Sequence, residues 1–196
     1  MRRNATLLAL LVLLGIAANC AKAEPGDLLQ SFLNPKGTTY PSSGHFWIRG
    51  AVTAVGENVL VGFPFDDTFG ADAGVACLFD SSTGKVLHTF KSPNPAAGGN
   101  FGCSVAAVGN RVLIGAYRES TEKVRLAGNV YVFDASTRKL IYTLVKPSPA
   151  TNDRFGFPAG VLGDNFLVSC KWDDTGAKDA GAVFLYDSQS GEVLQT

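Results

Sequence analysis

The strongest constraint on the fold is a turn segment that occurs three times along the chain. Its versions read FDSSTG at 79–84, FDASTR at 133–138 and YDSQSG at 186–191, so successive copies begin 54 and 53 residues apart. The residues that follow each turn recur in step, as in KVLHTF at 85–90 and KLIYTL at 139–144. A fixed period of about 50 residues is typical of an array of similar structural units, so the chain is expected to fold as three tandem copies.

Each copy contains four short runs that favour β-strands. The runs are rich in aliphatic and aromatic residues and are separated by clusters of Gly, Asn, Asp and Ser, which is typical of antiparallel hairpins. They do not show the sustained 3.6-residue period of a helix. In the second copy the strands are expected at 101–108, 111–117, 127–134 and 138–145.

The third strand of each copy is apolar on both faces. In the second copy Val130 and Val132 belong to one face and Tyr131 belongs to the other, and the first and third copies keep this pattern. A sheet with two apolar faces cannot bury both of them alone, so it has to stack between neighbouring sheets. Four-stranded repeats of about this length are typical of β-propeller blades.

The predicted fold is therefore an all-β, propeller-type array of about three four-stranded antiparallel blades. The blades are expected at 46–91, 101–146 and 155–196. Closed propellers have roughly four to eight blades, so this array is incomplete for a ring. The segment 26–33 also matches the fourth strand of the repeat, and it has no partner strand in the sequence. We expect the array either to associate with other chains or to continue in further C-terminal blades.

Residues 1–23 have the features of a cleaved secretory signal. Arg2 and Arg3 precede an apolar run at 7–18, and the small residues Ala21 and Ala23 precede the expected cleavage position. The apolar run is shorter than the roughly 20 residues that a membrane span needs. We therefore expect cleavage after Ala23 and a secreted or periplasmic protein without a membrane span.

The charge balance argues against a nucleic-acid ligand. Without residues 1–23 the chain has 14 basic and 17 acidic side chains, a mild negative balance with no basic stripe, whereas nucleic-acid-binding surfaces are strongly basic. This part of the chain keeps Cys77, Cys103 and Cys170, which hold different positions in the repeat. They are expected to be small buried hydrophobic residues rather than members of a disulfide framework.

The recurring aspartate of each turn has a geometric explanation. Asp80, Asp134 and Asp187 are expected to accept hydrogen bonds from backbone N–H groups of the hairpin turn, while Gly84 relieves the strain of a positive φ. Arg138 holds the same place as Gly84 in the second copy. If it adopts the same conformation, the strain amounts to about 1 kcal/mol.

Three motifs of the second copy carry a resemblance to a known repeat. They are Phe-Gly at 101–102, Gly-Ala at 115–116 after an aliphatic run, and GNVYVFD at 128–134. The sequence resembles the FG-GAP repeats, which are the blade units of integrin α-subunit propellers and of many bacterial exported proteins. The resemblance implies a propeller whose loops at one end serve adhesion or ligand binding.

The copies depart from this family pattern in several places. Phe46-Trp47 replaces the Phe-Gly pair in the first copy, and Ser169-Cys170 replaces the Gly-Ala pair in the third. The chain also lacks the calcium loop of alternating acidic residues that integrin-type blades carry. Acidic residues do occur in the corresponding loops of the first and third copies, whereas the loop of the second copy lacks both aspartates of their Asp-Asp pair. We expect these loops either to be solvated or to bind calcium through Asp66, Asp67, Asp72, Asp173, Asp174 and Asp179.

The same loops supply the candidate ligand-binding residues. They connect the second and third strands of the copies at 64–74, 117–128 and 171–181. Lys123 and Arg125 distinguish the loop of the second copy, and Trp172 stands beside Asp173 in the third. A tryptophan at such a place can stack on a sugar or anchor a protein partner, and core packing is the alternative for Trp172. The predicted ligand is a protein or a carbohydrate.

The chain offers few groups for catalysis. His45 and His88 are its two histidines, and neither has cysteine or carboxylate partners at the spacing of a zinc site. Gly-x-Ser-x-Gly, Walker and dinucleotide motifs are absent from the sequence. We therefore expect a non-catalytic protein without a cofactor. The alternatives are a segment that resembles quinoprotein dehydrogenases, which need a tryptophan at a fixed position of the repeat, and a degenerate fragment without a ligand.

Overall fold

The computed structural model describes residues 28, 30–36 and 51–196. It divides the chain into two compact units, Met1–Ser31 and Phe32–Thr196. The expected signal sequence lies outside the described residues, as do His45, Phe46 and Trp47. Among the described residues no helix is long and apolar enough to cross a membrane.

Three four-stranded antiparallel sheets make up the described part of the second unit, which contains no helix. We call them blades 1, 2 and 3. Blade 1 consists of β1 (Val52–Val55), β2 (Asn58–Phe63), β3 (Val75–Asp80) and β4 (Val86–Phe90). Blade 2 consists of β5 (Ser104–Val108), β6 (Arg111–Ala116), β7 (Asn129–Asp134) and β8 (Leu140–Leu144). Blade 3 consists of β9 (Phe155–Leu162), β10 (Asn165–Cys170), β11 (Ala182–Asp187) and β12 (Val193–Gln195).

This architecture confirms the predicted all-β class and the propeller-type array. Within each blade the strands pair in sequence order, so each blade is a simple meander. The strands of blade 2 lie within the ranges that the sequence predicted. β6, β7 and β8 match these ranges to within two residues at each end, and β5 begins at Ser104 because residues 101–103 form the turn that enters it. Residues 30–36 lie outside the three sheets.

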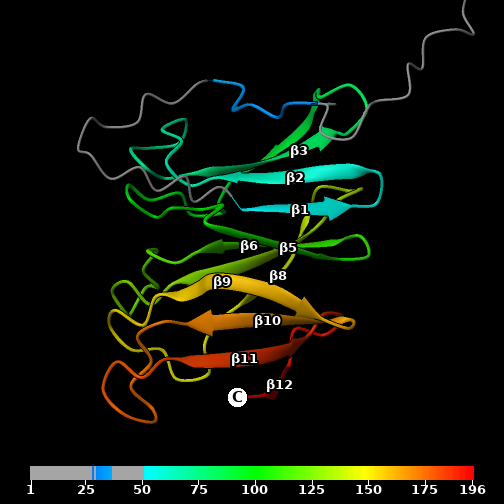
Figure 1. Ribbon diagram of the computed structural model, residues 1–196. Helices are drawn as coiled ribbons and strands as arrows, with labels where there is room; N and C mark the ends of the chain where they lie inside the picture. Colours follow the sequence, from blue (N-terminus) through cyan, green and yellow to red (C-terminus); the bar gives the residue numbers. More distant parts are fainter. Residues whose placement is uncertain (1–27, 29, 37–50) are drawn as a thin grey trace, which may run out of the picture. The chain divides into compact units, whose positions relative to one another are not determined.

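Neighbouring blades contact each other through their first strands. β5 contacts β1 on one side and β9 on the other. In Figure 1 these three strands lie in the middle, and the later strands of blades 1 and 3 extend away from them in opposite directions. This is the arrangement of successive propeller blades, in which the first strand is innermost and the fourth is outermost.

The hydrophobic core lies between the blades. One cluster joins Leu60, Leu78 and Phe90 of blade 1 to Ile114 and Phe133 of blade 2. A second cluster joins blade 2 to blade 3 in the same way, with Val130 and Val132 packed against the rings of the next blade. We call the face that packs on the preceding blade the leading face, and the face that packs on the following blade the trailing face. Blade 2 is therefore apolar on both faces because it packs between two neighbouring blades, as the sequence predicted.

Glycines allow the backbones of neighbouring blades to approach closely. A Cβ atom on Gly62 would lie 1.9 Å from the carbonyl oxygen of Gly102, and one on Gly115 would lie 2.2 Å from that of Gly156. Gly62 and Gly115 belong to the inner half of blades 1 and 2, and Gly102 and Gly156 belong to the following blades. This contact explains why both glycines recur in the repeat.

The hairpin turns have the geometry that the repeat predicts. Asp80 Oδ1 accepts hydrogen bonds from the backbone N–H groups of Ser82 and Thr83. The hydroxyl groups of the same two residues also donate to it, and together these bonds lower the pKa of Asp80 to about 2. Arg138 has a φ of 64°, beside 66° for Gly84, so it adopts the left-handed conformation that was expected to strain it.

Candidate functional site

The loops between the second and third strands of the three blades lie at one end of the array, on the left in Figure 1. Backbone hydrogen bonds connect them through the segment that precedes β9. The N–H of Asn152 donates to the carbonyl oxygen of Arg125 at 3.1 Å, and the N–H of Trp172 donates to that of Asp153 at 3.3 Å. The structure therefore brings together two loops that are about 50 residues apart in the sequence. We call this end of the array the loop end.

A buried acidic side chain recurs at the start of each of these loops. Asp66, Glu119 and Asp173 are 2%, 2% and 1% exposed. Their carbonyl oxygens accept a hydrogen bond from the glycine that precedes the third strand, at 2.9, 2.9 and 3.0 Å in blades 1, 2 and 3. Glu119 therefore takes the place of Asp66 and Asp173 in blade 2. The loop of the second copy lacks the aspartates, as the sequence showed, but it retains a carboxylate.

Near each buried carboxylate of the loop end lies a residue from one shared position of the repeat. In the first two blades this position comes two residues after the fourth strand. Asn34 Nδ2 donates to Asp66 Oδ2 at 2.8 Å, and Lys146, two residues after β8, forms an ion pair with Asp173. At the boundary between blades 1 and 2 the corresponding residue is Ser92, two residues after β4, whose Oγ lies 3.5 Å from Tyr131 Oη. Tyr131 in turn donates to Glu119 Oε2 at 2.5 Å. Asn34, Ser92 and Lys146 therefore share one position of the repeat, but their functional groups differ: an amide, a hydroxyl and an ammonium.

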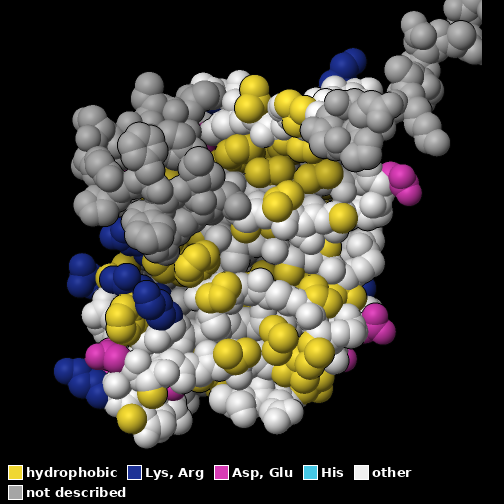
Figure 2. Space-filling model, viewed as in Figure 1, with side chains coloured by type: hydrophobic (Ala, Val, Ile, Leu, Met, Phe, Trp, Pro, Cys, Tyr) yellow, Lys and Arg dark blue, Asp and Glu magenta, His cyan; other side chains and the backbone are white. Residues whose placement is uncertain are grey.

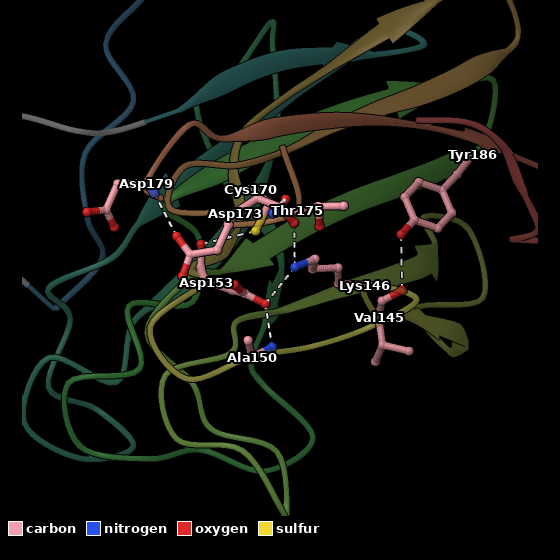
Figure 3. Close-up of polar contacts among 10 residues, drawn as sticks. Val145, Lys146, Ala150, Asp153, Cys170, Asp173, Thr175, Asp179 and Tyr186 are labelled. Carbon is pink, nitrogen blue, oxygen red and sulfur yellow. Dashed lines mark hydrogen bonds and ion pairs between the residues drawn. The ribbon is translucent and has the colours of Figure 1, made fainter. Parts of the chain in front are cut away.

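The Lys146 site is the most highly charged of the three. Its ammonium group lies 3.0 Å from Asp153 Oδ2 and also contacts Asp173, and all three side chains are almost fully buried (Figure 3). Cys170 Sγ donates to the carbonyl oxygen of Asp153 at 3.1 Å. Burial lowers the pKa of Lys146, but the hydrogen bonds that its ammonium donates to the carboxylates of Asp173 and Asp153 outweigh this effect, and the pKa of the lysine is raised. Likewise burial would raise the pKa of Asp173, whereas its bonds to Lys146 and Thr175 lower it. The cluster therefore holds an ammonium between two carboxylates.

Among the described residues, no cation forms an ion pair with Glu119. Its Oε2 accepts hydrogen bonds from Tyr131 and from Asn129 Nδ2, the latter at 3.1 Å, while its Oε1 is buried without a hydrogen-bond partner among the described residues. Burial raises the pKa of Glu119 despite the bonds from Ser92, Tyr131 and Asn129. The boundary between blades 1 and 2 thus buries a carboxyl group whose pKa lies above its ordinary value.

The six aspartates proposed for calcium binding divide into two kinds. Asp66 and Asp173 are buried at blade boundaries, and the other four are partly or fully exposed. The carboxylates of Asp67 and Asp174 accept hydrogen bonds from the N–H groups of the loop residues five positions later, at 2.8 and 2.6 Å. The same hydrogen bond stabilises both loops, so the recurrence of these aspartates has a structural explanation that does not need a bound ion.

One group of acidic and thiol side chains in the described part of the chain is close enough to hold a metal ion. It consists of Asp153, Cys170 and Asp173, whose ligand atoms lie within 4.8 Å of one another. It contains only one of the six aspartates. The Lys146 ammonium is already ion-paired with both of its carboxylates, so a positive charge is built into the cluster.

The three candidate ligand-binding residues all lie at the loop end. Lys123 and Arg125 are exposed on the loop of blade 2, and Trp172 is half-buried on the loop of blade 3. The ammonium group of Lys171 lies 4.8 Å from the centroid of the Trp172 ring. Sequence reasoning missed Lys171, Arg154 and the exposed Lys178, which lie on the same loops or between them. In Figure 2 lysine and arginine side chains gather on this side of the molecule.

The remaining reactive side chains are withdrawn from solvent or packed. Cys77, Cys103 and Cys170 are free and buried, which agrees with their predicted role as small core residues. Burial raises the pKa of Cys103 and Cys170 to about 12. His88 packs edge-on against Phe90 with ring centroids 4.6 Å apart. These contacts favour packing over nucleophilic or general-base chemistry.

Comparison with known families supports the repeat assignment. Residues 90–133 match the FG-GAP repeat family, so this part of the chain, from the end of β4 to the end of β7, is an FG-GAP repeat. No curated protein matches the chain. The matched segment contains one glycine of each close contact between blades, Gly102 of the first contact and Gly115 of the second.

Proposed function

We propose that the chain is an exported, non-catalytic propeller module that binds a protein or carbohydrate ligand at its loop end and serves in adhesion or scaffolding. The observation that carries the proposal is the position of Trp172, Lys123 and Arg125 on neighbouring loops, which are connected through Asn152 and Asp153. Residues from separate repeats meet on one surface, as binding residues on a rigid scaffold do.

The chemistry of the loop end favours an anionic ligand. Blades 2 and 3 expose the basic residues Arg118, Lys123, Arg125, Lys171 and Lys178 there, against the exposed acidic residues Glu122, Asp174 and Asp179. The carboxylates of Glu119, Asp153 and Asp173 are buried. The Trp172 ring adds a flat apolar contact beside these charges. An acidic oligosaccharide or an acidic peptide segment would meet both features.

A binding assay tests this proposal. Immobilised acidic and neutral oligosaccharides and acidic and neutral peptides should be probed with the mature chain at two salt concentrations. We expect acidic probes to bind more tightly, and Trp172→Ala and the double variant Lys123→Ala/Arg125→Ala each to reduce binding at least tenfold. Lys139→Ala, in the exposed turn between β7 and β8, is the matched control. Equal binding by all variants would contradict a ligand site at the loop end.

The quinoprotein alternative receives no support from the position of Trp172. In blades 1 and 2 the corresponding residues are Phe65 and Arg118, each directly before the buried acidic residue. An aromatic ring at a fixed position of every blade is therefore not maintained. We infer that the module binds its ligand without transforming it.

A further inference from the structure

The buried ammonium group of Lys146 lies against the carboxylates of two residues from different segments of the chain. Its Nζ is 3.0 Å from Asp153 Oδ2 and also contacts Asp173 Oδ2 (Figure 3). The exposed fraction is 5% for the side chain of Lys146 and 1% for that of each aspartate. An amine and a carboxyl group, the two reactants of an amide bond, are thus in direct contact at a site with little access for water.

Hydrogen bonds orient both carboxylates toward the ammonium group. The N–H of Thr175 donates to Asp173 Oδ1 at 2.8 Å, and the other oxygen, Oδ2, faces Lys146. The N–H of Ala150 donates to Asp153 Oδ2 at 2.5 Å, and the same oxygen contacts the ammonium group. Reactants that are held in contact in this way react as parts of one molecule, which lowers the barrier relative to a reaction between free groups.

We propose that Lys146 and Asp173 condense to form an intramolecular isopeptide bond, with Asp153 as the group that transfers the proton. Lys146 Nζ forms a bond to Asp173 Cγ, and the bond between Cγ and Oδ2 breaks. Asp153 accepts one proton from Nζ and delivers it to Oδ2, and a second proton passes from Nζ to Oδ2, so that one water leaves. The product is a neutral amide, and Asp153 is a carboxylate again at the end. The reaction consumes neither an oxidant nor a further reactant.

The surroundings favour both the reaction and its product. As Nζ attacks, negative charge develops on Asp173 Oδ1, and the Thr175 N–H that already donates to this oxygen stabilises it. The product removes two opposite charges from a buried site, where charges are costly because they are withdrawn from water. The raised pKa of Lys146 keeps the amine mostly charged, so the reaction should be slow and should follow folding. Before it takes place, the two residues remain an ion pair.

The other buried acids of the loop end have no such nucleophile in contact with them. Asp66 accepts a hydrogen bond from the amide of Asn34, and Glu119 accepts bonds from a phenol and an amide. Among the residues that the structure describes, Lys146 alone forms ion pairs with carboxylates. The isopeptide bond would connect the segment after β8 to the loop after β10, so it would tie blade 2 to blade 3 covalently.

Mass spectrometry of the full mature chain tests for the bond. We expect the folded wild type to lose the mass of one water during incubation over several days, relative to the mass of its sequence. Trypsin cleaves after lysine and arginine but not before proline, so it yields the peptides 140–154 and 172–178. The first contains Lys146 and the second contains Asp173. The bond converts them into one branched peptide, and its fragmentation identifies the linked residues.

Three variants separate the roles of the groups. Lys146→Arg keeps the positive charge without the primary amine, and Asp173→Ala removes the carboxyl group, so neither should yield the branched peptide. Asp153→Asn should yield it at a rate lower by about a hundredfold or more, because the amide cannot transfer the proton. A wild-type rate in this variant would refute the role of Asp153. Lys139→Arg, in the exposed turn between β7 and β8, is the matched control and should react as the wild type does.

The wild-type digest distinguishes the bond from other reactions. If the chain keeps its full mass and both peptides stay linear, the proposal is overturned. Loss of water within 140–154 would place the bond on Asp153, and loss within 172–178 would indicate a cyclic imide, so both results contradict a bond to Asp173. The wild type decides the question even where a variant fails to fold. Ligand binding at the loop end is measured separately, so a negative result leaves the proposed function standing.

Discussion

The ammonium group of Lys146 is ion-paired with Asp173, although the two residues belong to different blades. Both side chains are buried, and Asp153 forms a second ion pair with the same ammonium. The boundary between blades 2 and 3 thus contains three charges within an otherwise apolar layer. Among the described residues, the hydrogen-bond partners of the two other acidic side chains, Asp66 and Glu119, are uncharged, although Lys36 also interacts electrostatically with Asp66.

Removal of the ammonium should strongly destabilise the fold. Lys146→Met would leave Asp153 and Asp173 buried without a counter-charge, and breaking a buried pair in this way costs about 3–5 kcal/mol. We expect a loss of that size in the free energy of unfolding, measured by urea denaturation. Lys139→Met, at an exposed turn, should change it by less than about 0.5 kcal/mol.

A double variant shows whether the stability lost in Lys146→Met comes from the unpaired charges or from the changed shape of the side chain. Ser92 and Gly99 hold the places of Lys146 and Asp153 at the boundary between blades 1 and 2, so Lys146→Ser/Asp153→Gly introduces the residues that this other boundary has at the two places. It removes the ammonium together with one carboxylate. We expect it to unfold at higher urea concentration than Lys146→Met. Equal stability of the two variants would show that the unpaired Asp153 carboxylate is not the source of the loss.

The close contact between Gly115 and Gly156 should leave no room for a side chain at position 115. Gly115→Ala places a Cβ atom 2.2 Å from the Gly156 carbonyl oxygen, so the backbones must separate. Overpacking of this kind costs about 1–3 kcal/mol, and we expect the upper part of that range in thermal or urea unfolding. Gly160→Ala is the matched control, because a Cβ atom there meets nothing within 4 Å. Similar losses in both variants would refute the packing argument.

The strained turn of blade 2 offers a stabilising substitution. Arg138 has a φ of 64° at a place where blades 1 and 3 have glycine, and an L-residue in this conformation loses about 1–2 kcal/mol. Glycine at the same place has a larger entropy loss on folding of about 0.5–1 kcal/mol. Arg138→Gly should therefore raise the free energy of unfolding by up to about 1 kcal/mol, while Gly84→Arg should lower it. A decrease for Arg138→Gly would mean that the guanidinium has contacts that outweigh the strain.

The sequence predicted the fold well because the blade is a local structure. The alternation of Val130, Tyr131 and Val132 and the recurring aspartate of the turns depend on neighbours within one hairpin, and both are confirmed. The buried acidic position was harder to recognise. Its partners Asn34, Ser92 and Lys146 differ in chemistry, lie outside the blade that carries the acidic residue and carry no shared motif.

One signal for the acidic position was present in the spacing to the glycine before the third strand. Asp66 and Asp173 precede that glycine by eight residues, and Glu119 precedes it by nine. The extra residue and the change from aspartate to glutamate concealed the equivalence. Calcium binding by the six loop aspartates and ligand binding by Trp172, Lys123 and Arg125 remain predictions, because they depend on an ion or a ligand and not on packing within the chain.

The stability of the fold should depend on pH in opposite ways through the two buried acids Glu119 and Asp173. Burial raises the folded-state pKa of Glu119 above its ordinary value of 4.5. The folded state then binds the proton more tightly than the unfolded state does. The stability that this protonation contributes is complete below pH 4.5 and is lost as the pH rises through the folded-state pKa. Asp173 behaves oppositely, because its lowered pKa contributes stability above its ordinary value of 3.8 that is lost as the pH falls through the folded-state pKa.

Glu119→Gln removes the first of these effects and leaves the second. Since the amide stays neutral, the variant should gain stability over the wild type as the pH rises from 4.5 toward neutrality, and the two should converge at acid pH. Urea unfolding at a series of pH values measures the difference directly. Glu122→Gln, on the exposed part of the same loop, should run parallel to the wild type throughout. A constant offset between Glu119→Gln and the wild type at every pH would show that Glu119 titrates normally in the folded protein, and that its unpartnered oxygen has found a cation or a donor.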